Sequence, residues 1–262
     1  VEAAATRQPT PPAPARRLLT TGAAMSATYR QPSTAGQPMS RMASGKFAWC
    51  LSILARALQR LSGGRAALYA YLICAQPLGR GAFAALRDDA GTEIRRAQPG
   101  DPLLDGLPRP AGVLTRRFGT GATCHVAVVK SRFGGCIWLA RGHYDEDEVR
   151  CRFVLPPDPA CVWDFDVYVE PTLRLGRTLG RLWKAVDQEL ASAGFAWSFS
   201  RISLYNPASI QAHERLGAVR VATALFLQLG PVQLSAFTQR PYLHLGFGPG
   251  HVPALHLAAP GH

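Results

Sequence analysis

The sequence predicts a mixed α/β fold of the α+β kind, in which a mostly antiparallel, twisted sheet carries helices on both faces. Three observations predict it. Residues 163–229 alternate between strand and helix patterns, residues 122–139 hold two short apolar runs joined by a turn, and residues 149–155 add a further run. An antiparallel meander followed by strand, helix and strand gives a mixed sheet whose faces helices must cover.

The first elements of this predicted domain precede the meander. Residues 94–102 and 113–119 are expected to form its first strand and first helix. Residues 122–129 and 135–139 then form a hairpin around the turn at 130–134. Residues 149–155 and 163–169 supply two more strands.

A helix is predicted over residues 179–193, because its apolar side chains repeat at the spacing of one buried stripe: Leu179, Leu182, Trp183, Val186 and Leu190. Gly194 suits its C-terminal cap. After a short run at 196–205, Asn206 suits an N-cap with Pro207 in the first helical position. That helix ends at Gly217, and the β-branched, apolar segment 219–229 reads as a strand.

The chain divides into four regions. Residues 1–45 form a Pro/Ala/Arg-rich tail that is expected to be disordered, and that reads either as a transit peptide or as an upstream-extended translation. Residues 46–90 are expected to be helical or irregular, and residues 91–230 to form the main domain. Residues 231–262 are a C-terminal extension of unknown role.

The composition limits the classes of partner. The net charge is +12 and the isoelectric point about 10.0, but the arginines are scattered, which argues against nucleic acid as the main partner.

No apolar run is long enough to cross a bilayer. Residues 47–61 read as an amphipathic helix that either packs on the domain or touches an anionic membrane. Six widely spaced cysteines predict buried thiols, no metal site and a reducing cytoplasmic location.

The most informative stretch starts at the alternating strand 163–169 and runs through Val169-Glu170-Pro171 to the Arg/Gly-rich segment 174–180. A strand that leads through such a turn into a helix can hold an anion. The first backbone N–H groups of a helix are unpaired and lie at the positive end of its dipole, and arginine adds charge-assisted hydrogen bonds. This predicts a nucleotide-type cofactor.

These residues resemble the acyl-CoA-binding half of the GNAT (Gcn5-related) N-acetyltransferase superfamily. The resemblance rests on the V-x-P turn, the Arg/Gly loop, Asn206 and the later Leu216-Gly217, and it is good over residues 161–230. The loop departs from the family pattern: counted from Arg174, the two glycine places hold Arg177 and Leu179.

The resemblance implies the fold, acetyl-CoA or another acyl-CoA as co-substrate, and an amine-bearing acceptor. The cofactor-binding residues that it implies are Tyr168, Val169, Arg174, Leu175, Gly176, Arg177, Thr178, Leu179, Gly180 and Asn206. The acceptor, the acyl chain length and the oligomeric state stay open.

N-acyl transfer needs a base for the attacking ammonium and an acid for the leaving thiolate. On an alternating strand, Asp164 and Asp166 share one face with Tyr168, and a carboxylate beside a cleft would have a raised pKa. Asp164 or Asp166 is therefore the expected base, in line with the family's acid on this strand. The alternative is that both face solvent or pair with nearby arginines.

His213, seven residues after Asn206, is the candidate proton donor to the thiolate, or else a surface or capping histidine. Asn206 can bind the pantetheine arm, cap its helix, or do both. The acidic run 145–148 can attract a cationic amine or form a solvated turn.

Two functions are compatible with these residues. The first is a GNAT-like N-acyltransferase that moves an acetyl or other acyl group from acyl-CoA to an amine by direct transfer. The second is a catalytically silent module of the same fold, or a basic binding module that recruits an anionic partner.

Overall fold

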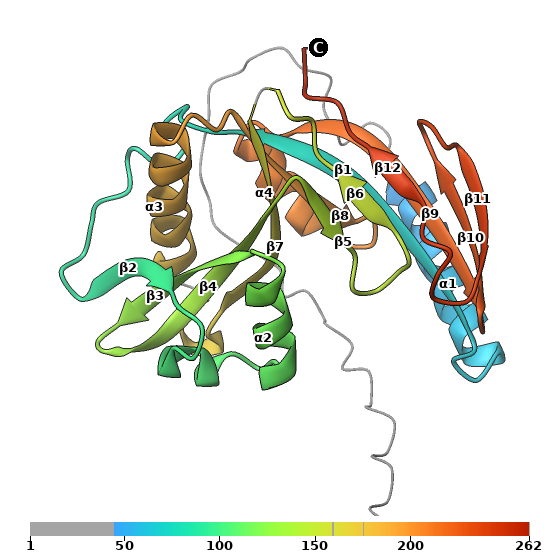
Figure 1. Cartoon of the computed structure of the whole chain (residues 1–262), viewed down its shortest axis with the longest axis horizontal. Helices are drawn as coiled ribbons and strands as arrows, with labels where there is room; N and C mark the ends of the chain where they lie inside the picture. The colour runs from blue at the N-terminus through green and yellow to red at the C-terminus, as the bar shows by residue number, and fades with distance from the viewer. Residues whose placement is uncertain (1–44, 159, 175, 262) are drawn as a thin grey trace, which may run out of the picture.

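A nine-stranded sheet forms the centre of the molecule in this computed structural model, which describes residues 45–158, 160–174 and 176–261 (Figure 1). The strand order is β11-β10-β9-β1-β8-β7-β4-β3-β2, and a three-stranded sheet of order β12-β6-β5 lies against it. The strands are β1 Ala66–Pro77, β2 Thr92–Ala97, β3 Thr123–Val129, β4 Arg132–Arg141, β5 His143–Asp145, β6 Arg152–Val154, β7 Cys161–Val169, β8 Trp197–Ser203, β9 Val219–Leu229, β10 Val232–Phe237, β11 Leu243–Phe247 and β12 Ala254–His256. The helices are α1 Gly45–Leu61, α2 Ala111–Gly119, α3 Thr178–Ser192 and α4 Pro207–Arg215, with short 3-10 turns η2 Pro102–Gly106 and η3 Pro171–Leu173.

The predicted fold class is confirmed. Among the strand pairs described for the large sheet, β7 and β8 alone run parallel, and the other neighbours are antiparallel. The hairpin β3–β4, the helices α2, α3 and α4, and the strands β2, β8 and β9 all occur where the sequence predicts them.

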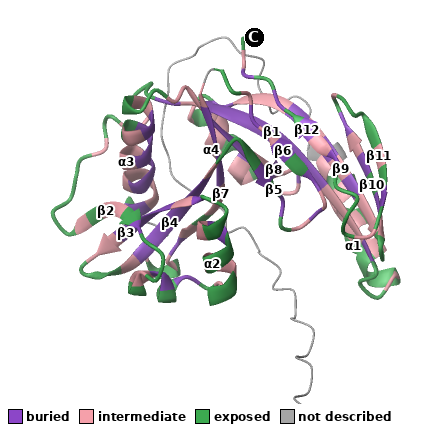
Figure 2. Cartoon of the chain, in the orientation of Figure 1, coloured by how far each residue is buried: buried purple, intermediate pink, exposed green. Residues whose placement is uncertain are grey.

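Helices cover both faces of the half of the sheet that ends in β2. Successive side chains of β4 point to opposite faces. Ile137 packs in a cluster with Leu182 of α3, whereas Trp138 packs against Phe118 of α2. Figure 2 shows the buried residues of α3 on the side that faces the sheet. The helices α3 and α2 therefore lie on opposite faces.

The other half of the sheet has the same two layers with different partners. On β1, Leu72 packs in a cluster with Ile210 of α4, whereas Ile73 packs in a cluster with Phe153 of β6. The helix α4 lies on the α3 face, and the small sheet covers the α2 face. The apolar cores are thus divided between two layers, one on each side of the large sheet.

The expectation for residues 46–90 is wrong at its centre. This segment, predicted helical or irregular, contributes the central strand β1, which pairs with both β8 and β9. Residues 70–76 of β1 are buried on both faces, so the strand reads as a continuous apolar run without the alternation that marks a half-exposed strand. The helix expected over 47–61 is present as α1 and contacts β1.

The C-terminal extension also belongs to the sheets. Strands β10 and β11 extend the large sheet beyond β9, and β12 pairs in parallel with β6. The run 149–155, predicted as a strand of the meander, forms β6 of the small sheet instead, because its partners are β5 and β12. The predicted tail at residues 1–44 lies outside the described residues.

The described helices include none with the length and apolar character needed to span a bilayer. Five of the six cysteines are buried, including Cys74, Cys124 and Cys136, whose burial the sequence predicts; Cys50 is exposed.

Gly135 permits the close approach of β4 and β7. A Cβ at this position would lie 2.5 Å from the Tyr168 carbonyl oxygen and 3.2 Å from the Val169 Cα, both backbone atoms that cannot rotate away.

We predict that Gly135→Ala lowers the free energy of unfolding by roughly 3 kcal/mol, since overpacking forces the strands apart. Urea denaturation measures it. Gly112→Ala on α2, where the new methyl meets open space, should be neutral or up to about 1 kcal/mol stabilising; equal effects of the two changes would contradict the packing argument.

Candidate functional site

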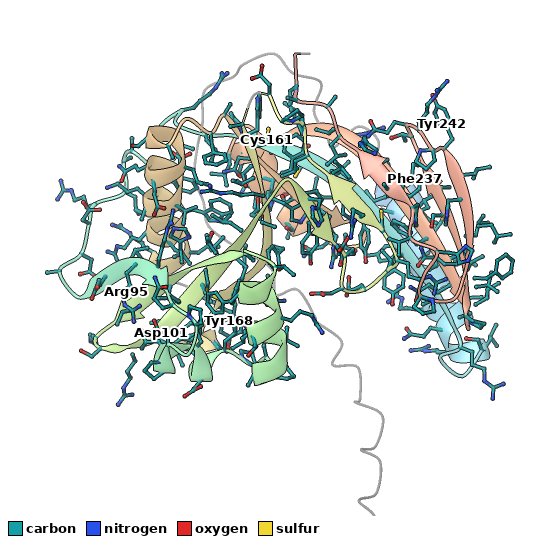
Figure 3. The ribbon with its side chains drawn as sticks, in the orientation of Figure 1. Arg95, Asp101, Cys161, Tyr168, Phe237 and Tyr242 are labelled. Carbon is teal, nitrogen blue, oxygen red and sulfur yellow. The ribbon has the colours of Figure 1, made fainter. Side chains whose placement is uncertain are left out.

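The strands β7 and β8 separate after a short parallel pairing. Their register runs only from Cys161–Trp163 of β7 to Trp197–Phe199 of β8. Beyond it, β7 continues along β4 and β8 continues along β1. Figure 3 labels Cys161 and Tyr168 near the two ends of β7. The facing edges of residues 164–169 and 200–203 therefore carry backbone N–H and C=O groups that the ladder between these strands does not use.

A bulge in β7 lies within this opening. Cys136 of β4 pairs with Tyr168 and Trp138 pairs with Phe165, so Asp166 and Val167 together oppose Ile137. Asp166 has a φ of 46°, a left-handed conformation that is uncommon for residues other than glycine. The extra residue changes the face of every side chain that follows it.

The bulge contradicts the prediction that Asp164 and Asp166 share a face. Asp164 lies on the face covered by α3 and α4, where the Ser198 hydroxyl donates to it. Asp166 lies on the α2 face, where it binds two arginines. Simple alternation along the strand fails here because the positive φ rotates the chain between the two acids.

Asp166 is bound by Arg109 and Arg117. Arg109 donates to both carboxylate oxygens at 2.9 and 2.5 Å, and Arg117 donates at 2.5 Å. The Arg117 guanidinium also lies over the rings of Trp138 and Phe165. The sequence left this ion pair open only as an alternative and did not single out either arginine, because they lie 57 and 49 residues before Asp166.

Asp164 has the opposite environment. Its side chain is buried, and burial raises its pKa to about 7, which the hydrogen bond from Ser198 only partly offsets. The Ser198 Oγ to Asp164 Oδ2 distance is 2.7 Å. A carboxyl group with this pKa can take up or release a proton near neutral pH. The expectation of a raised pKa on β7 is therefore confirmed for Asp164.

The loop that follows β7 leads into α3 with basic side chains and no acid in the first turn of the helix. Arg174 Nε donates to the Val169 carbonyl at 3.1 Å, which folds this side chain back onto the end of β7. Arg177 precedes the helix, is exposed, and makes no side-chain cap. Leu175, predicted to bind the cofactor, lies outside the described residues.

The first turn of α3 keeps its N-terminal N–H groups without a side-chain cap. These belong to Thr178, Leu179 and Gly180, all three of which the sequence predicted to bind the cofactor. They lie at the positive end of a 15-residue helix, and Arg174 and Arg177 add positive charge beside them. This donor set suits a phosphate group.

Gly180 also has a packing role that the sequence did not reveal. A Cβ at Gly180 would lie 3.0 Å from Leu86 Cδ2. Leu86 belongs to the segment between β1 and β2, which lies along α3: Lys184 donates to the Leu86 carbonyl, and Arg181 pairs with Asp89. The glycine therefore admits a neighbouring loop on one side of the helix.

At the end of β7, Tyr168 stacks on Phe133 with ring centroids 6.0 Å apart, and its hydroxyl donates to Glu170 at 3.2 Å. Val169 is buried, and its carbonyl accepts from Arg174. The structure thus brings Tyr168, Val169 and Arg174 together beside the start of α3.

Asn206 caps α4 as predicted, since its side-chain oxygen accepts from the Ser209 N–H at 3.1 Å. His213 Nδ1 donates to the Ser209 carbonyl at 2.9 Å, which leaves Nε2 as an acceptor in the neutral ring. Burial lowers the pKa of His213, so the neutral form predominates near pH 7. This environment opposes the expected role of His213 as an imidazolium proton donor.

The acidic run 145–148 forms a bridge across the opening on the α2 face. Asp147 pairs with Arg117, which binds Asp166 of β7. Glu146 and Glu148 both pair with Arg201 of β8. The Tyr71 hydroxyl donates to Glu148 at 2.8 Å, and the Arg201 guanidinium lies over the Tyr71 ring. With Asp145 bound to Arg152, all four acids of the run form ion pairs. The run is therefore neither an unpaired, solvated turn nor a set of free carboxylates that could attract an amine.

A hollow of about 640 Å³ lies at another place, between residues 239–242 and β12. It shares no residue with the opening between β7 and β8. Its partly polar rim includes Arg240 and His256.

Comparison with known proteins gives distant structural likenesses. No family model and no curated protein matches the sequence significantly. A conserved protein of unknown function from Staphylococcus epidermidis has a TM-score of 0.45 at 10% identity, over 66% of each chain. A tandem GNAT protein from the clavulanic acid biosynthesis pathway has a TM-score of 0.44 at 17% identity, over 63% of this chain and 55% of that one. An aminoglycoside acetyltransferase from a soil metagenome has a TM-score of 0.33 at 12% identity, over 48% and 87%. Likenesses at this distance identify neither a family nor an activity for this chain.

The raised pKa of Asp164 predicts a pH-dependent stability. The folded state keeps a proton that the unfolded chain releases between about pH 4 and pH 7, so this group's contribution is complete below pH 4 and is lost as the pH rises through about 7. In Asp164→Asn the side chain stays neutral. We expect the stability difference between Asp164→Asn and the parent to move by about 3 kcal/mol in favour of the variant between pH 5 and pH 8. Urea denaturation at both pH values measures it, and a constant difference would show that Asp164 titrates normally.

Proposed function

We propose that this chain is an acyl-CoA-dependent N-acyltransferase that uses the opening between β7 and β8. The observation that carries the proposal is the position of the one described parallel pair of the large sheet. These two strands, β7 and β8, separate beside the first turn of α3, which has no side-chain cap and is preceded by Arg174 and Arg177. The separated edges offer backbone hydrogen bonds to an extended ligand, and the helix start offers N–H groups to its phosphates. The resemblance of residues 161–230 to the GNAT superfamily agrees with this use.

The residues present suit acyl-CoA, with acetyl-CoA as its simplest form. The N–H groups of Thr178, Leu179 and Gly180 would hold the pyrophosphate, together with Arg174 and Arg177. The backbone at Val169 and the amide of Asn206 would bind the pantetheine arm, although the Asn206 side chain also caps α4. Bound acyl-CoA supplies the thioester.

Asp164 is the better candidate for the base. Its pKa of about 7 lets it accept a proton from an ammonium acceptor near neutral pH. Asp166 is bound by two guanidinium groups, which occupy both of its carboxylate oxygens. In this proposal Asp164 takes one proton from the ammonium group, the amine nitrogen attacks the thioester carbonyl carbon, the C–S bond breaks, and the second N–H proton passes to the leaving sulfur, so that CoA departs as its thiol.

Asp166 acts in this proposal as a positioning residue. Its two ion pairs hold the bulge of β7 against α2, and the acidic bridge 145–148 connects the same arginine network to β8. The two edges of the opening are thereby held at a set separation on the α2 face. On this face the side chains of Asp147 and Glu148 are 52% and 37% exposed, whereas the proposed base Asp164 lies on the opposite face of the sheet.

The phosphate site predicts a specific effect of two arginines. Arg177→Ala and Arg174→Ala should each weaken CoA binding by about tenfold or more, because each removes a charge-assisted hydrogen bond. Isothermal titration calorimetry with acetyl-CoA on the full chain, at low and moderate salt, measures it. Arg116→Ala on α2 removes an exposed arginine from the other face and should leave binding unchanged. Absent binding, or binding weakened equally by all three changes, would favour the basic binding module instead.

The base assignment predicts a difference between two neighbouring acids. With a panel of primary amines and detection of the released thiol, Asp164→Asn should lower turnover by about 100-fold or more and remove a pH dependence centred near pH 7. CoA binding should stay near the parent value. Asp88→Asn, which removes an exposed carboxylate, is the matched control.

Asp166→Asn should act mainly through stability, because it leaves the buried Arg117 without its closest partner, at a cost of roughly 3 kcal/mol. Unchanged turnover and pH profile in Asp164→Asn would exclude Asp164 as the base.

A further inference from the structure

Acidic residues are absent from the segments that build one end of the large sheet. The 17 acidic residues of the chain are Glu2 and sixteen others that all lie between residues 88 and 214. Residues 45–87 and 215–262 contain none. These two segments come together in space as α1, β1 and β9–β12, with β1 paired to β9. Among the described side chains of these segments, arginine is the only fully charged type.

The same end exposes most of the large apolar side chains that reach the surface. Among the described residues, nine of the twelve exposed large apolar side chains belong to α1 and β9–β11. They are Trp49, Ile53, Leu54 and Leu61 on α1, and Leu229, Leu234, Leu243, Leu245 and Phe247 on the strands. We call these nine residues the apolar end face. Figure 2 shows the exposed residues along β11.

The strand residues of the apolar end face share one side of the sheet. Leu234 pairs with Leu245, and Val232 pairs with both Leu229 and Phe247. Paired residues point to the same face of a sheet, as do alternate residues along a strand. Leu227 of β9 lies on this face because it pairs with Leu234. Leu68 of β1 lies on the same face because it pairs with Leu227. Residues of the opposite face, such as Gln233 and Ser235, are buried.

The helix α1 covers only part of this side. It contacts β1 and lies on the side of the sheet away from β12 (Figure 1). A helix with its side chains is about 10–12 Å wide, whereas neighbouring strands lie about 4.8 Å apart. A helix placed over β1 therefore reaches about one strand to each side, which leaves β10 and β11 beside it. Leu68 and Leu227 are accordingly half-buried, while Leu245 is 52% exposed.

The outer arc of α1 continues the apolar end face. Leu51, Ala55 and Leu58 are half-buried and mark the side turned to the sheet. At 100° per residue, Trp49 and Ile53 fall on the opposite arc, and Leu54 and Leu61 fall on one flank of the helix. Arg56 and Arg60, both exposed, lie on the same arc as Trp49 and Ile53. Tryptophan and aliphatic side chains interspersed with arginine suit a membrane interface, because the long arginine side chain can extend its guanidinium group to the head groups.

Charge decides which occupant suits this end. A second copy of the chain would bring an equally basic, acid-free surface against it, and residues 1–44, with Glu2 as their one acid, are also basic. Both would meet like charge. We propose that the apolar end face, together with Arg56 and Arg60 of α1, binds the surface of an anionic phospholipid bilayer. The phospholipid head groups pair with the arginines, and the apolar side chains enter the interface. This proposal does not depend on the acyltransferase activity.

Vesicle flotation with the full chain tests the proposal. At 0.15 M salt, we expect binding to vesicles of 30% phosphatidylserine in phosphatidylcholine and at least tenfold weaker binding to phosphatidylcholine alone. The double change Leu245→Gln with Phe247→Gln should weaken binding at least tenfold without a change in charge. Val167→Gln, at an exposed apolar residue outside the apolar end face, is the matched control and should bind like the parent.

The arginines are tested separately. Arg56→Ala and Arg60→Ala should each weaken vesicle binding about fivefold, the effect of one basic residue near an anionic surface. The exposed Arg116→Ala, on α2, should not. Circular dichroism melting confirms that each variant is folded. Because every variant keeps residues 1–44, any contribution of that basic segment is the same in all of them.

Three results would overturn the proposal. The first is no binding to anionic vesicles. The second is binding that the Leu245/Phe247 double change leaves intact, which would reduce the effect to scattered positive charge. The third is a dimer, seen by analytical ultracentrifugation, that this double change converts to a monomer, because the apolar end face would then belong to a second copy of the chain.

Discussion

The ion pairs of Asp166 with Arg109 and Arg117 are the constraint on which the site depends. A non-glycine residue at a φ of 46° costs of the order of 1–3 kcal/mol, and the bulge that contains it would relax without a partner. The two guanidinium groups supply that partner in a largely buried setting, where the side chains of Asp166 and Arg117 are only 10% and 9% exposed. The bulge lies in the part of β7 that stays paired with β4 after the pairing with β8 has ended.

The bulge also gives two acids of one strand opposite chemistry. Asp166 is paired with two arginines. Asp164 points into the layer between the sheet and the helices α3 and α4, where its described polar contact is the Ser198 hydroxyl and where burial dominates its pKa. Had the strand alternated regularly, both acids would have shared the arginines or shared the buried layer. The separation of the ion-paired Asp166 from the buried Asp164 therefore follows from a change of one residue in register.

Local patterns in the sequence were enough to place the helices and most strands, because helical periodicity and capping residues are read within one or two turns. Asn206 and its helix illustrate this. The central position of β1 could not be read in the same way, since a strand buried on both faces looks like any short apolar run. The partners of Asp166 lie about 50 residues away in sequence, and Leu86 beside Gly180 lies across a loop. Those contacts depend on how the strands and loops are arranged in three dimensions, and the residue pattern of 163–180 does not indicate that arrangement.

The uneven distribution of acids along the chain explains how one sequence builds two different surfaces. The run 145–148 and Asp166 lie where arginines from α2, β6 and β8 converge, so their charges are neutralised internally and hold the strands around the opening. The arginines of α1 have no acid within their own segments, and β1 and β9–β12 bring none to them. Their field is directed outward, beside side chains that favour an apolar environment. The acids in the middle of the chain are balanced by arginines and lysines of the same region, so the net charge of +12 is carried largely by the two ends of the chain. The pairing of β1 with β9 brings the described parts of those ends together on one side of the molecule.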